Sequence, residues 1–303
     1  MTALTRFPRL RATLMLCALL LAPAAFAQAP VPRADAWVSS VQMPAWLERA
    51  GERQPLVPAT VLRPGDAVIT GAGGRAQLRM AEGSTIKLGE SGRLAISDLR
   101  VTRGSSTILA GLLEVAQGAF RFTTSALNRT RSERDLQIRI ATVTAGIRGT
   151  DLWGRGNAER EIVCLIEGRI TVTRGSDAPI TMSEPLSFYI APVGAPALPV
   201  AAVDPKQLAQ WAAETELVPG AGAATMGGRF HALAATRDNQ DEALQVYDAL
   251  RTAGFAAVIR PLKSEAGLRY EVRIANLPSA AEANALAKRI STLPGMAPAS
   301  PAR

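Results

Sequence analysis

Few side chains in this sequence could act as nucleophiles, general bases or metal ligands. Its 303 residues include one histidine, His231, and two cysteines, Cys17 and Cys164. A zinc site, a Cys–His catalytic pair and a disulfide framework all need more of these residues than the chain holds. The sequence therefore predicts no metal site, no cofactor and no catalytic residue, and it favours a binding protein over an enzyme.

Two other patterns could suggest chemistry. Gly71-Ala72-Gly73-Gly74 is as glycine-rich as a phosphate-binding loop, but no Lys-Ser/Thr follows it and no helix pattern begins there. We interpret it as a hairpin turn. Asp66 and Asp151 stand beside turn glycines, where a carboxylate commonly accepts backbone N–H groups. Acid–base catalysis at either residue would need a second carboxylate and a cleft.

The first 27 residues have the three parts of a secretory signal. They are a basic start (Arg6, Arg9, Arg11), an apolar stretch from Ala12 to Leu21, and the small-residue end Ala25-Phe26-Ala27. We expect cleavage after Ala27 and a periplasmic protein. The apolar stretch is shorter than the roughly 20 residues of a bilayer span, so no transmembrane span should remain after cleavage. Retention of residues 1–27 as an anchor is the alternative.

Cleavage would change the charge and the thiol content. The chain has 34 Lys and Arg against 26 Asp and Glu, and loss of three arginines leaves 31 against 26, a net charge of +5. This mild bias does not indicate a nucleic-acid partner. Cys164 would be the one remaining cysteine, and its apolar neighbours Ile162–Ile166 predict a small buried hydrophobic residue.

Residues 56–190 predict a mainly β domain. Short runs of alternating apolar residues are separated by glycine, as in Arg75–Met80, Ser84–Leu88 and Arg93–Ile96. The pattern predicts a β-sandwich or a β-solenoid, with residues 128–135 as an exposed loop. Residues 28–55, which contain two tryptophans, are expected to form a lead-in segment.

A linker rich in proline, alanine and glycine is expected at 191–228, with one short helix at 204–216. Asp204 is placed to cap this helix and Pro205 to occupy its first position. Leu208, Trp211 and Ala212 form its apolar stripe.

Residues 229–296 contain an internal repeat at an offset of 40. Its matched pairs are Phe230 with Tyr270, Ala234 with Ile274, Ala243 with Ala283, Val246 with Leu286, and Leu250 with Ile290. Each half is one strand followed by one helix, the helices spanning 239–252 and 279–293, with a hairpin through 264–267 between the halves. Ser279 is the expected N-cap, with Glu282 at the capping-box position. The order β-α-β-β-α-β places both helices on one face of a sheet, and residues 297–303 are expected to be a disordered tail.

Strand alternation then identifies the candidate binding residues. If Tyr270, Val272 and Ile274 face the helices, Glu271 and Arg273 face the open side of the sheet. The repeat places three further residues beside them: Arg229, His231 and Leu233.

The β region resembles the FecR domain of bacterial envelope proteins. The matching stretches are Leu62–Gly71, Ala76–Met80, Glu82-Gly83-Ser84, Ile86-Lys87-Leu88, Ala141–Thr144, Gly146–Asp151 and Ile166–Val172. The family is named after a sensor of iron-siderophore uptake that controls a sigma factor. That signalling role needs a membrane span and a cytoplasmic tail, which we do not expect here.

The last unit resembles a SPOR domain, a module that binds peptidoglycan glycan strands stripped of their stem peptides, usually at division septa. The resemblance is strongest at Tyr270–Leu277, followed by Ser279, Glu282-Ala283 and Leu286. It implies glycan binding by the open sheet face, with Arg229, His231, Leu233, Glu271 and Arg273 as the glycan-binding residues. Leu233 stands where the family favours glutamine, and Glu271 where it favours arginine.

These observations predict an exported, non-enzymatic envelope protein. The SPOR-like unit would bind peptidoglycan, and the FecR-like domain would serve as a scaffold for an unknown envelope protein or another ligand. One alternative is a FecR-type periplasmic regulator or sensor of envelope signalling, and another is an envelope hydrolase.

Overall fold

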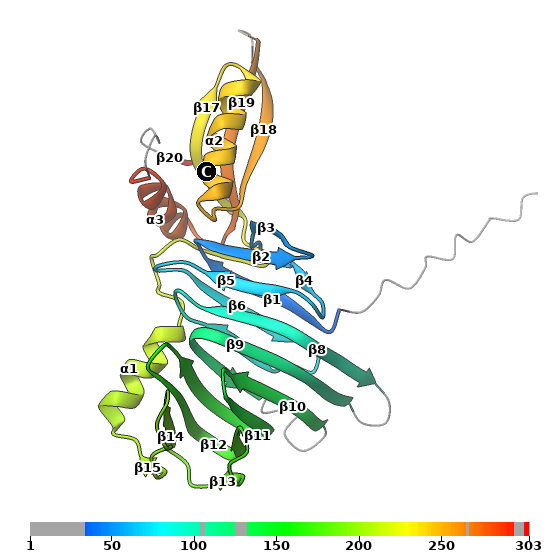
Figure 1. The fold of residues 1–303 in the computed structure, drawn as a ribbon. Coiled ribbons are helices and arrows are strands. Elements are labelled where there is room, and N and C mark those ends of the chain that lie inside the picture. The colour runs from blue at the N-terminus through cyan, green and yellow to red at the C-terminus, as the bar shows by residue number, and fades with distance from the viewer. Residues whose placement is uncertain (1–33, 104–106, 125–131, 265–266, 294–299, 303) are drawn as a thin grey trace, which may run out of the picture. The chain divides into compact units, whose positions relative to one another are not determined.

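The computed structural model describes residues 34–103, 107–124, 132–264, 267–293 and 300–302. A mainly β region precedes a small α+β unit, as the sequence predicts (Figure 1). The expected signal segment, residues 1–27, lies outside the described residues.

The β region consists of short strands and three long ones. In chain order they are β1 (Ala36–Gln42), β2 (Ala45–Arg49), β3 (Glu52–Pro55), β4 (Val61–Leu62), β5 (Ala67–Thr70), β6 (Arg75–Met80), β7 (Thr85–Leu88), β8 (Arg93–Arg103), β9 (Thr107–Thr123), β10 (Ser132–Ile140), β11 (Val143–Gly156), β12 (Arg160–Arg174), β13 (Ile180–Met182), β14 (Ser187–Pro192) and β15 (Ala201–Ala202). Helix α1 (Pro205–Thr215) and β16 (Ala223–Thr225) follow.

Hydrogen bonds join β1–β16 into one continuous sheet, which folds over on itself so that the long strands β9, β11 and β12 belong to both of its layers. One layer, the first sheet, contains β2, β5, β8 and β10, and the other, the second sheet, contains β1, β6, β7 and β14. The first part of β9 pairs with β8 and β10, and its last part pairs with β7 and β11. Strand β12 pairs with β11 over most of its length, with β13 near one end and with β14 near the other. Apolar residues of both sheets form one core between them. Of the two architectures that the sequence left open, this is the sandwich.

Two glycines allow β11 and β12 to bend between the sheets. Gly149 has φ +64° and Gly168 has φ +96°, and the register of the pair shifts between Arg148 and Asp151. A Cβ on Gly168 would lie 2.6 Å from the carbonyl oxygen of Gly149. Glycine alone tolerates both the backbone conformation and this contact.

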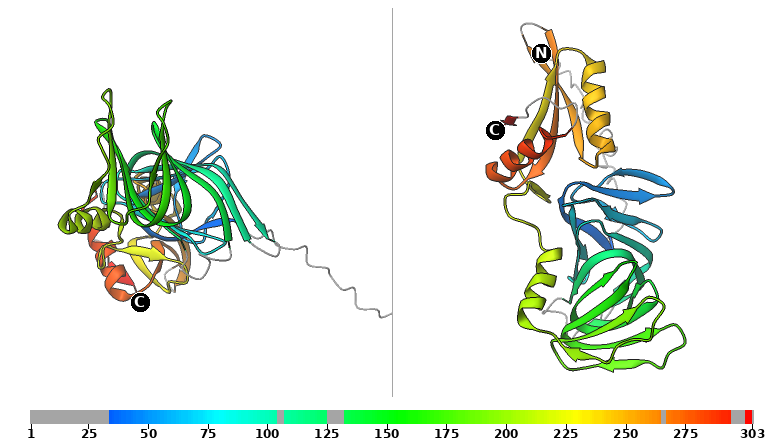
Figure 2. Two further views of the ribbon diagram at one scale, coloured as in Figure 1. Left: turned by 90° about the horizontal axis from the view of Figure 1, so that it is seen from below. Right: turned by 60° about the vertical axis from the view of Figure 1, so that its left-hand side comes forward.

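Helix α1 packs on the outer face of the second sheet (Figure 2). The Asp204 carboxylate accepts the backbone N–H groups of Lys206 and Gln207, which confirms the predicted N-cap. Trp211 is buried and Leu208 packs beside it, so the predicted apolar stripe faces the strands. The cluster that α1 covers is separate from the main core and comprises Ala119, Trp153, Ile162, Cys164, Val203 and Trp211.

Residues 71–74 form a turn but not a hairpin, so the hairpin prediction was wrong. Strand β5 pairs with β2 and β8, whereas β6 pairs with β1 and β7. The turn therefore carries the chain from one sheet to the other.

The loop predicted at 128–135 is corrected in part. Residues 128–131 lie outside the described residues, but 132–135 begin β10 and pair in parallel with 107–110 of β9. The charged residues fit a strand because Leu136, Ile138 and Ile140 are buried while Asp135 and Arg139 are exposed.

The segment expected as a lead-in, 28–55, contributes paired strands. Strand β1 pairs with β6, and β2 pairs with β3 and β5. Among the described residues, the paired strands of the sandwich thus begin at Ala36, ahead of the expected boundary at residue 56.

The C-terminal unit has the predicted order of elements. They are β17 (Phe230–Arg237), α2 (Gln240–Thr252), β18 (Ala257–Ser264), β19 (Gly267–Leu277), α3 (Ala280–Ile290) and β20 (Ser300–Ala302). The sheet order is β18-β19-β17-β20. Strand β20 comes from residues that were expected to be a disordered tail, and it is defined by its pairing with β17.

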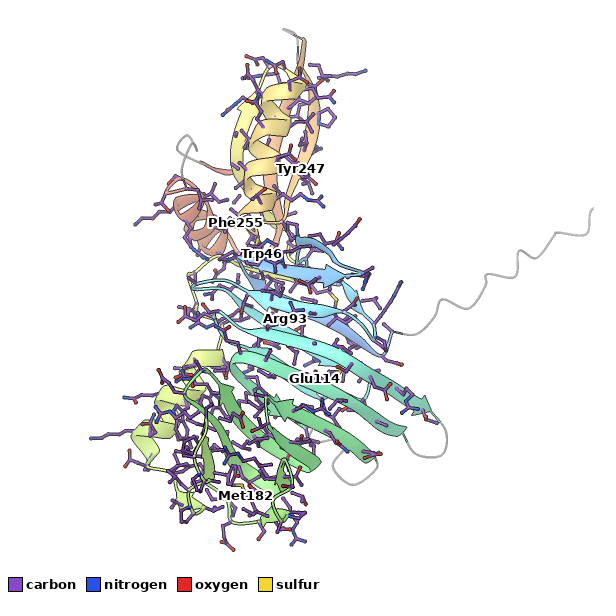
Figure 3. All side chains as sticks on the ribbon, viewed as in Figure 1. Trp46, Arg93, Glu114, Met182, Tyr247 and Phe255 are labelled. Atoms are coloured by element: carbon purple, nitrogen blue, oxygen red, sulfur yellow. The ribbon has the colours of Figure 1, made fainter. Side chains whose placement is uncertain are left out.

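Both helices pack on one face of this sheet. Tyr247 on α2 and Phe255 just after it pack in the core (Figure 3) with Val272 and Ile274 of β19. Ser279 caps α3 by accepting the N–H of Glu282, as predicted. The Glu282 carboxylate, in contrast, accepts the backbone N–H groups of residues 220, 222 and 223 at 2.7, 2.6 and 3.0 Å.

Candidate functional site

The open face of the C-terminal sheet carries a row of directly paired residues across three strands. Arg273 of β19 lies opposite Leu233 of β17 on one side and Val258 of β18 on the other. Paired residues in an antiparallel sheet point to the same face, so the guanidinium stem lies between two alkyl side chains. Val258 is 45% exposed, which leaves an apolar surface accessible beside the charge.

A second row lies two residues along β18 and β19 and, because the register shifts after Leu233, three residues along β17. Glu271 is opposite Thr236 of β17 and Arg260 of β18. Together the two rows place two guanidinium groups and one carboxylate on the face that the helices leave open.

His231 belongs to the same cluster. Its pKa is lowered from the ordinary value of 6.5, mainly by burial and then by the positive charge of Arg273. Glu271 opposes this effect, and Arg260 adds to it. At neutral pH the ring is therefore uncharged, so that one nitrogen can donate and the other can accept a hydrogen bond.

Arg273 has hydrogen-bonding capacity that the described residues leave unused. Its Nε is buried and has no partner among them. A buried N–H without an acceptor is costly.

The structure brings four of the five predicted residues together: His231, Leu233, Glu271 and Arg273. Arg229 is exposed and lies one residue before β17. Sequence reasoning missed Val258 and Arg260. A register counted back from the predicted hairpin would have placed them opposite residues 273 and 271.

This face offers guanidinium donors, a carboxylate acceptor, a neutral imidazole and exposed alkyl groups. Such a mixture suits a ligand that has many hydroxyl and amide groups together with apolar ring faces. Among the described residues, no group of three or more His, Cys, Asp or Glu side chains could hold a metal ion.

The two aspartates of the β region are engaged in ion pairs. Asp66 accepts Nε and Nη2 of Arg49, both at 2.7 Å, and also the backbone N–H of Arg63, as predicted for a turn. Asp151 instead lies on β11 and accepts Arg121 at 2.9 and 2.7 Å and the hydroxyl of Thr123 at 3.2 Å. The prediction of backbone partners for Asp151 was therefore wrong, because its neighbouring glycine forms a strand bend.

Cys164 is fully buried, as predicted. Burial, followed by the negative charge of Asp151, raises the pKa of its thiol to about 12. A thiol with this pKa is protonated and unreactive at neutral pH.

In the part of the chain that the structure describes, no helix is long and apolar enough to cross a membrane.

The chain is similar to two solved structures and matches two family models. Two solved structures of a candidate anti-sigma factor from Parabacteroides distasonis are similar to this chain at 12% sequence identity, with TM-scores of 0.39 and 0.38. In both, the match covers 67% of this chain and 96% of the solved one. No curated protein matches the sequence. The family model described as FecR protein matches residues 66–171, and the one described as SPOR domain matches residues 231–299. The chain thus combines a FecR domain with a C-terminal SPOR domain.

Proposed function

We propose that this protein is an exported, non-enzymatic component of the bacterial cell envelope whose SPOR domain binds peptidoglycan. Its ligand is the glycan strand freed of stem peptides, as found at the division septum. Its FecR domain serves as a scaffold for an envelope protein. The observation that carries the proposal is the gathering of His231, Leu233, Glu271 and Arg273 on the open sheet face.

The chemistry of this face supports a carbohydrate ligand. Arg260 and Arg273 can donate to hydroxyl and acetamido oxygens, while Glu271 can accept from hydroxyl groups. Val258 and Leu233 offer alkyl surface to the apolar faces of sugar rings. Each interaction is weak by itself, so a strand of several sugars is a better ligand than a single sugar.

Sedimentation of the full chain with purified sacculi tests the proposal. The protein should sediment more strongly after an amidase has removed the stem peptides. Arg273→Ala should weaken sedimentation at least about tenfold, because a hydrogen bond between a charged and a neutral group contributes about 1.5–3 kcal/mol.

The matched control is Arg251→Ala, which removes an arginine from the last turn of α2, on the helical side of the unit. It should sediment like the unmodified chain. Equal sedimentation of the Arg273→Ala chain would move the site off this face. No amidase-dependent sedimentation at all would contradict glycan binding.

A second candidate function is a periplasmic regulator or sensor of the FecR type, favoured by the FecR match at residues 66–171. The two functions differ in what happens to the N-terminus. The preferred function requires a protein in the soluble periplasmic fraction that begins at Gln28. Intact residues 1–27 in the membrane fraction would instead support an anchored regulator.

We also propose that the SPOR unit, residues 229–296, folds independently of the FecR domain at 56–190. Pro219, Gly220, Met226 and Gly227 are exposed in the segment before it and offer sites to a protease. Limited proteolysis should release a fragment that begins near Gly227 and keeps its helical circular dichroism. An unfolded fragment would contradict this division.

A further inference from the structure

The sheet surface beneath α1 has two chemically different halves. A row of directly paired residues crosses five strands, β7, β9, β11, β12 and β14, on the face away from the main core. The residues are Lys87, Arg121, Trp153, Cys164 and Phe188. The row therefore begins with two cations and ends with three apolar side chains.

The apolar half of α1 matches the apolar half of the row. The indole rings of Trp211 and Trp153 are stacked, with centroids 4.7 Å apart and planes 3° from parallel. Phe188 meets the Trp211 ring edge-on, at 5.7 Å between centroids. Trp153 and Cys164 are fully buried in the cluster that they form with Trp211.

The acidic end of α1 matches the cationic half. The Glu216 carboxylate accepts Lys87 Nζ at 2.6 and 2.5 Å and lies 3.5 Å from Arg121. Glu214 forms an ion pair with Arg155, one further cation of β11. The shape and charge of this sheet surface are thus complementary to a helix in which an aromatic residue is followed, three to five residues later, by carboxylates.

A small number of side chains attach α1 to this surface. The helix has 11 residues, which is short for a helix to be stable in water, and its buried residues are Trp211 and Thr215. The Lys87–Glu216 pair is partly exposed, with 23% and 44% of the side chains accessible. Exposed pairs of this kind contribute little. The Nε1–H of Trp153 is buried and has no acceptor among the described residues.

The strands that carry this surface have contacts of their own, apart from those with α1. Its residues lie on strands that are paired with one another and packed on the main core through their opposite face. If α1 lifted, these strands would expose a contiguous apolar patch flanked by cations, a typical protein-binding surface.

We propose that this sheet surface is the partner-binding surface of the FecR domain and that α1 covers it in the free protein. Its partner is an amphipathic helix of another protein that presents an aromatic side chain followed by carboxylates. The partner displaces α1 and supplies an acceptor to Trp153. The inference rests on the proposed function, in which the FecR domain is a scaffold for an envelope protein, and it specifies the class of that partner. Its test involves no glycan, so the two proposals fail separately.

A fluorescent peptide of residues 203–217, which carries the α1 sequence, serves as the probe. If α1 covers this surface, the peptide can bind only the small fraction of molecules in which the surface is exposed. The apparent affinity of the unmodified chain for the peptide is therefore reduced. Trp211→Ala should expose this surface and strengthen peptide binding at least about tenfold. It should also speed the alkylation of Cys164, measured by mass spectrometry of the peptide that contains it.

Gln210→Ala is the matched control, since this α1 side chain is exposed. It should leave peptide binding and alkylation unchanged. Lys87→Ala, combined with Trp211→Ala, should weaken peptide binding again. If Trp211→Ala loses the circular dichroism of the folded chain, the charge reversal of Glu214 and Glu216 to lysine tests the same release without altering an apolar contact.

Three results would overturn the proposal. The first is a folded Trp211→Ala chain that neither binds the peptide more tightly nor exposes Cys164. The second is peptide binding by the Trp211→Ala chain that the additional Lys87→Ala substitution does not weaken. The third is a dimer, detected by light scattering, that the peptide converts to monomer, because the occupant in trans would then be α1 of a second copy.

Discussion

Leu233 lies directly opposite Arg273 on the neighbouring strand of the SPOR sheet. The guanidinium at the centre of the open face is therefore flanked by an alkyl side chain where the family favours the hydrogen-bonding amide of glutamine. Glu271 adds a second difference two residues along β19, because a carboxylate replaces the arginine that the family favours. Both differences reduce the number of hydrogen-bond donors on this face.

Restoring these donors should strengthen glycan binding. Leu233→Gln together with Glu271→Arg adds an amide and a guanidinium to the face around Arg273. With a net contribution of about 1 kcal/mol for each new hydrogen bond, binding to amidase-treated sacculi should increase roughly five- to thirtyfold. Co-sedimentation at several protein concentrations measures the change. Unchanged or weaker binding by the double variant would mean that this face does not contact glycan through these positions.

His231 should make the stability of the chain depend on pH. Its pKa in the folded protein lies below the ordinary value, owing first to burial and then to Arg273, with Glu271 opposing and Arg260 adding to the effect. The unfolded chain thus binds the proton more tightly than the folded chain. The contribution of His231 to stability is present above pH 6.5, and it is lost as the pH falls through the lower pKa of the folded state.

Urea unfolding at pH 7.5 and at pH 5.5 tests this prediction. The free energy of unfolding should fall more between the two pH values for the unmodified chain than for His231→Asn. Because His231 is the one histidine of the sequence, no other imidazole contributes to the difference. Equal pH dependence of the two proteins would show that the folded environment does not disfavour protonation of His231.

Local patterns in the sequence predicted the elements well, but not their partners. Strand alternation correctly placed Glu271 and Arg273 on one face because it depends only on backbone geometry. Residues 71–74 were recognised as a turn, yet their flanking strands join different sheets, and no local signal records that choice. Arg260 was missed for the same reason, since it becomes part of the site only through the register of β18 with β19.

The SPOR repeat shows how tertiary contacts alter an otherwise regular pattern. Glu242 and Glu282 occupy equivalent positions, 40 residues apart, at the third residue after an N-cap. Glu242 accepts the side chain of its own cap, Asn239, at 2.7 Å. Glu282 instead holds three backbone N–H groups of the segment 220–223. The capping box is a local motif, and the sequence could not show that one of its two copies binds a distant loop.

This difference predicts unequal effects of the same substitution. Glu282→Gln removes the charge and one acceptor oxygen from three backbone donors, and it should lower the free energy of unfolding by about 1.5–3 kcal/mol. Glu242→Gln is the matched control and should cost less than about 0.5 kcal/mol, because its partners are exposed. Urea unfolding followed by circular dichroism measures both. Similar losses in the two variants would mean that the contact with residues 220–223 contributes nothing to stability.

The bend of the sandwich provides the last prediction. Gly168 combines a φ of +96° with a site where a Cβ would lie 2.6 Å from the carbonyl oxygen of Gly149. Gly168→Ala must therefore bear both the left-handed conformation and a collision with backbone, which a side-chain rotation cannot relieve. Gly175 has φ +50° but open space around its Cβ position, so Gly175→Ala bears the conformational cost alone, about 1–2 kcal/mol.

Gly168→Ala should be less stable than Gly175→Ala by at least about 2 kcal/mol in urea unfolding. Because β11 and β12 pass between the sheets at this point, the loss should also appear as faster amide exchange in β13 and β14, which pair with β12 on either side of the bend. Equal stability of the two variants would show that the strands can cross between the sheets without glycine at position 168.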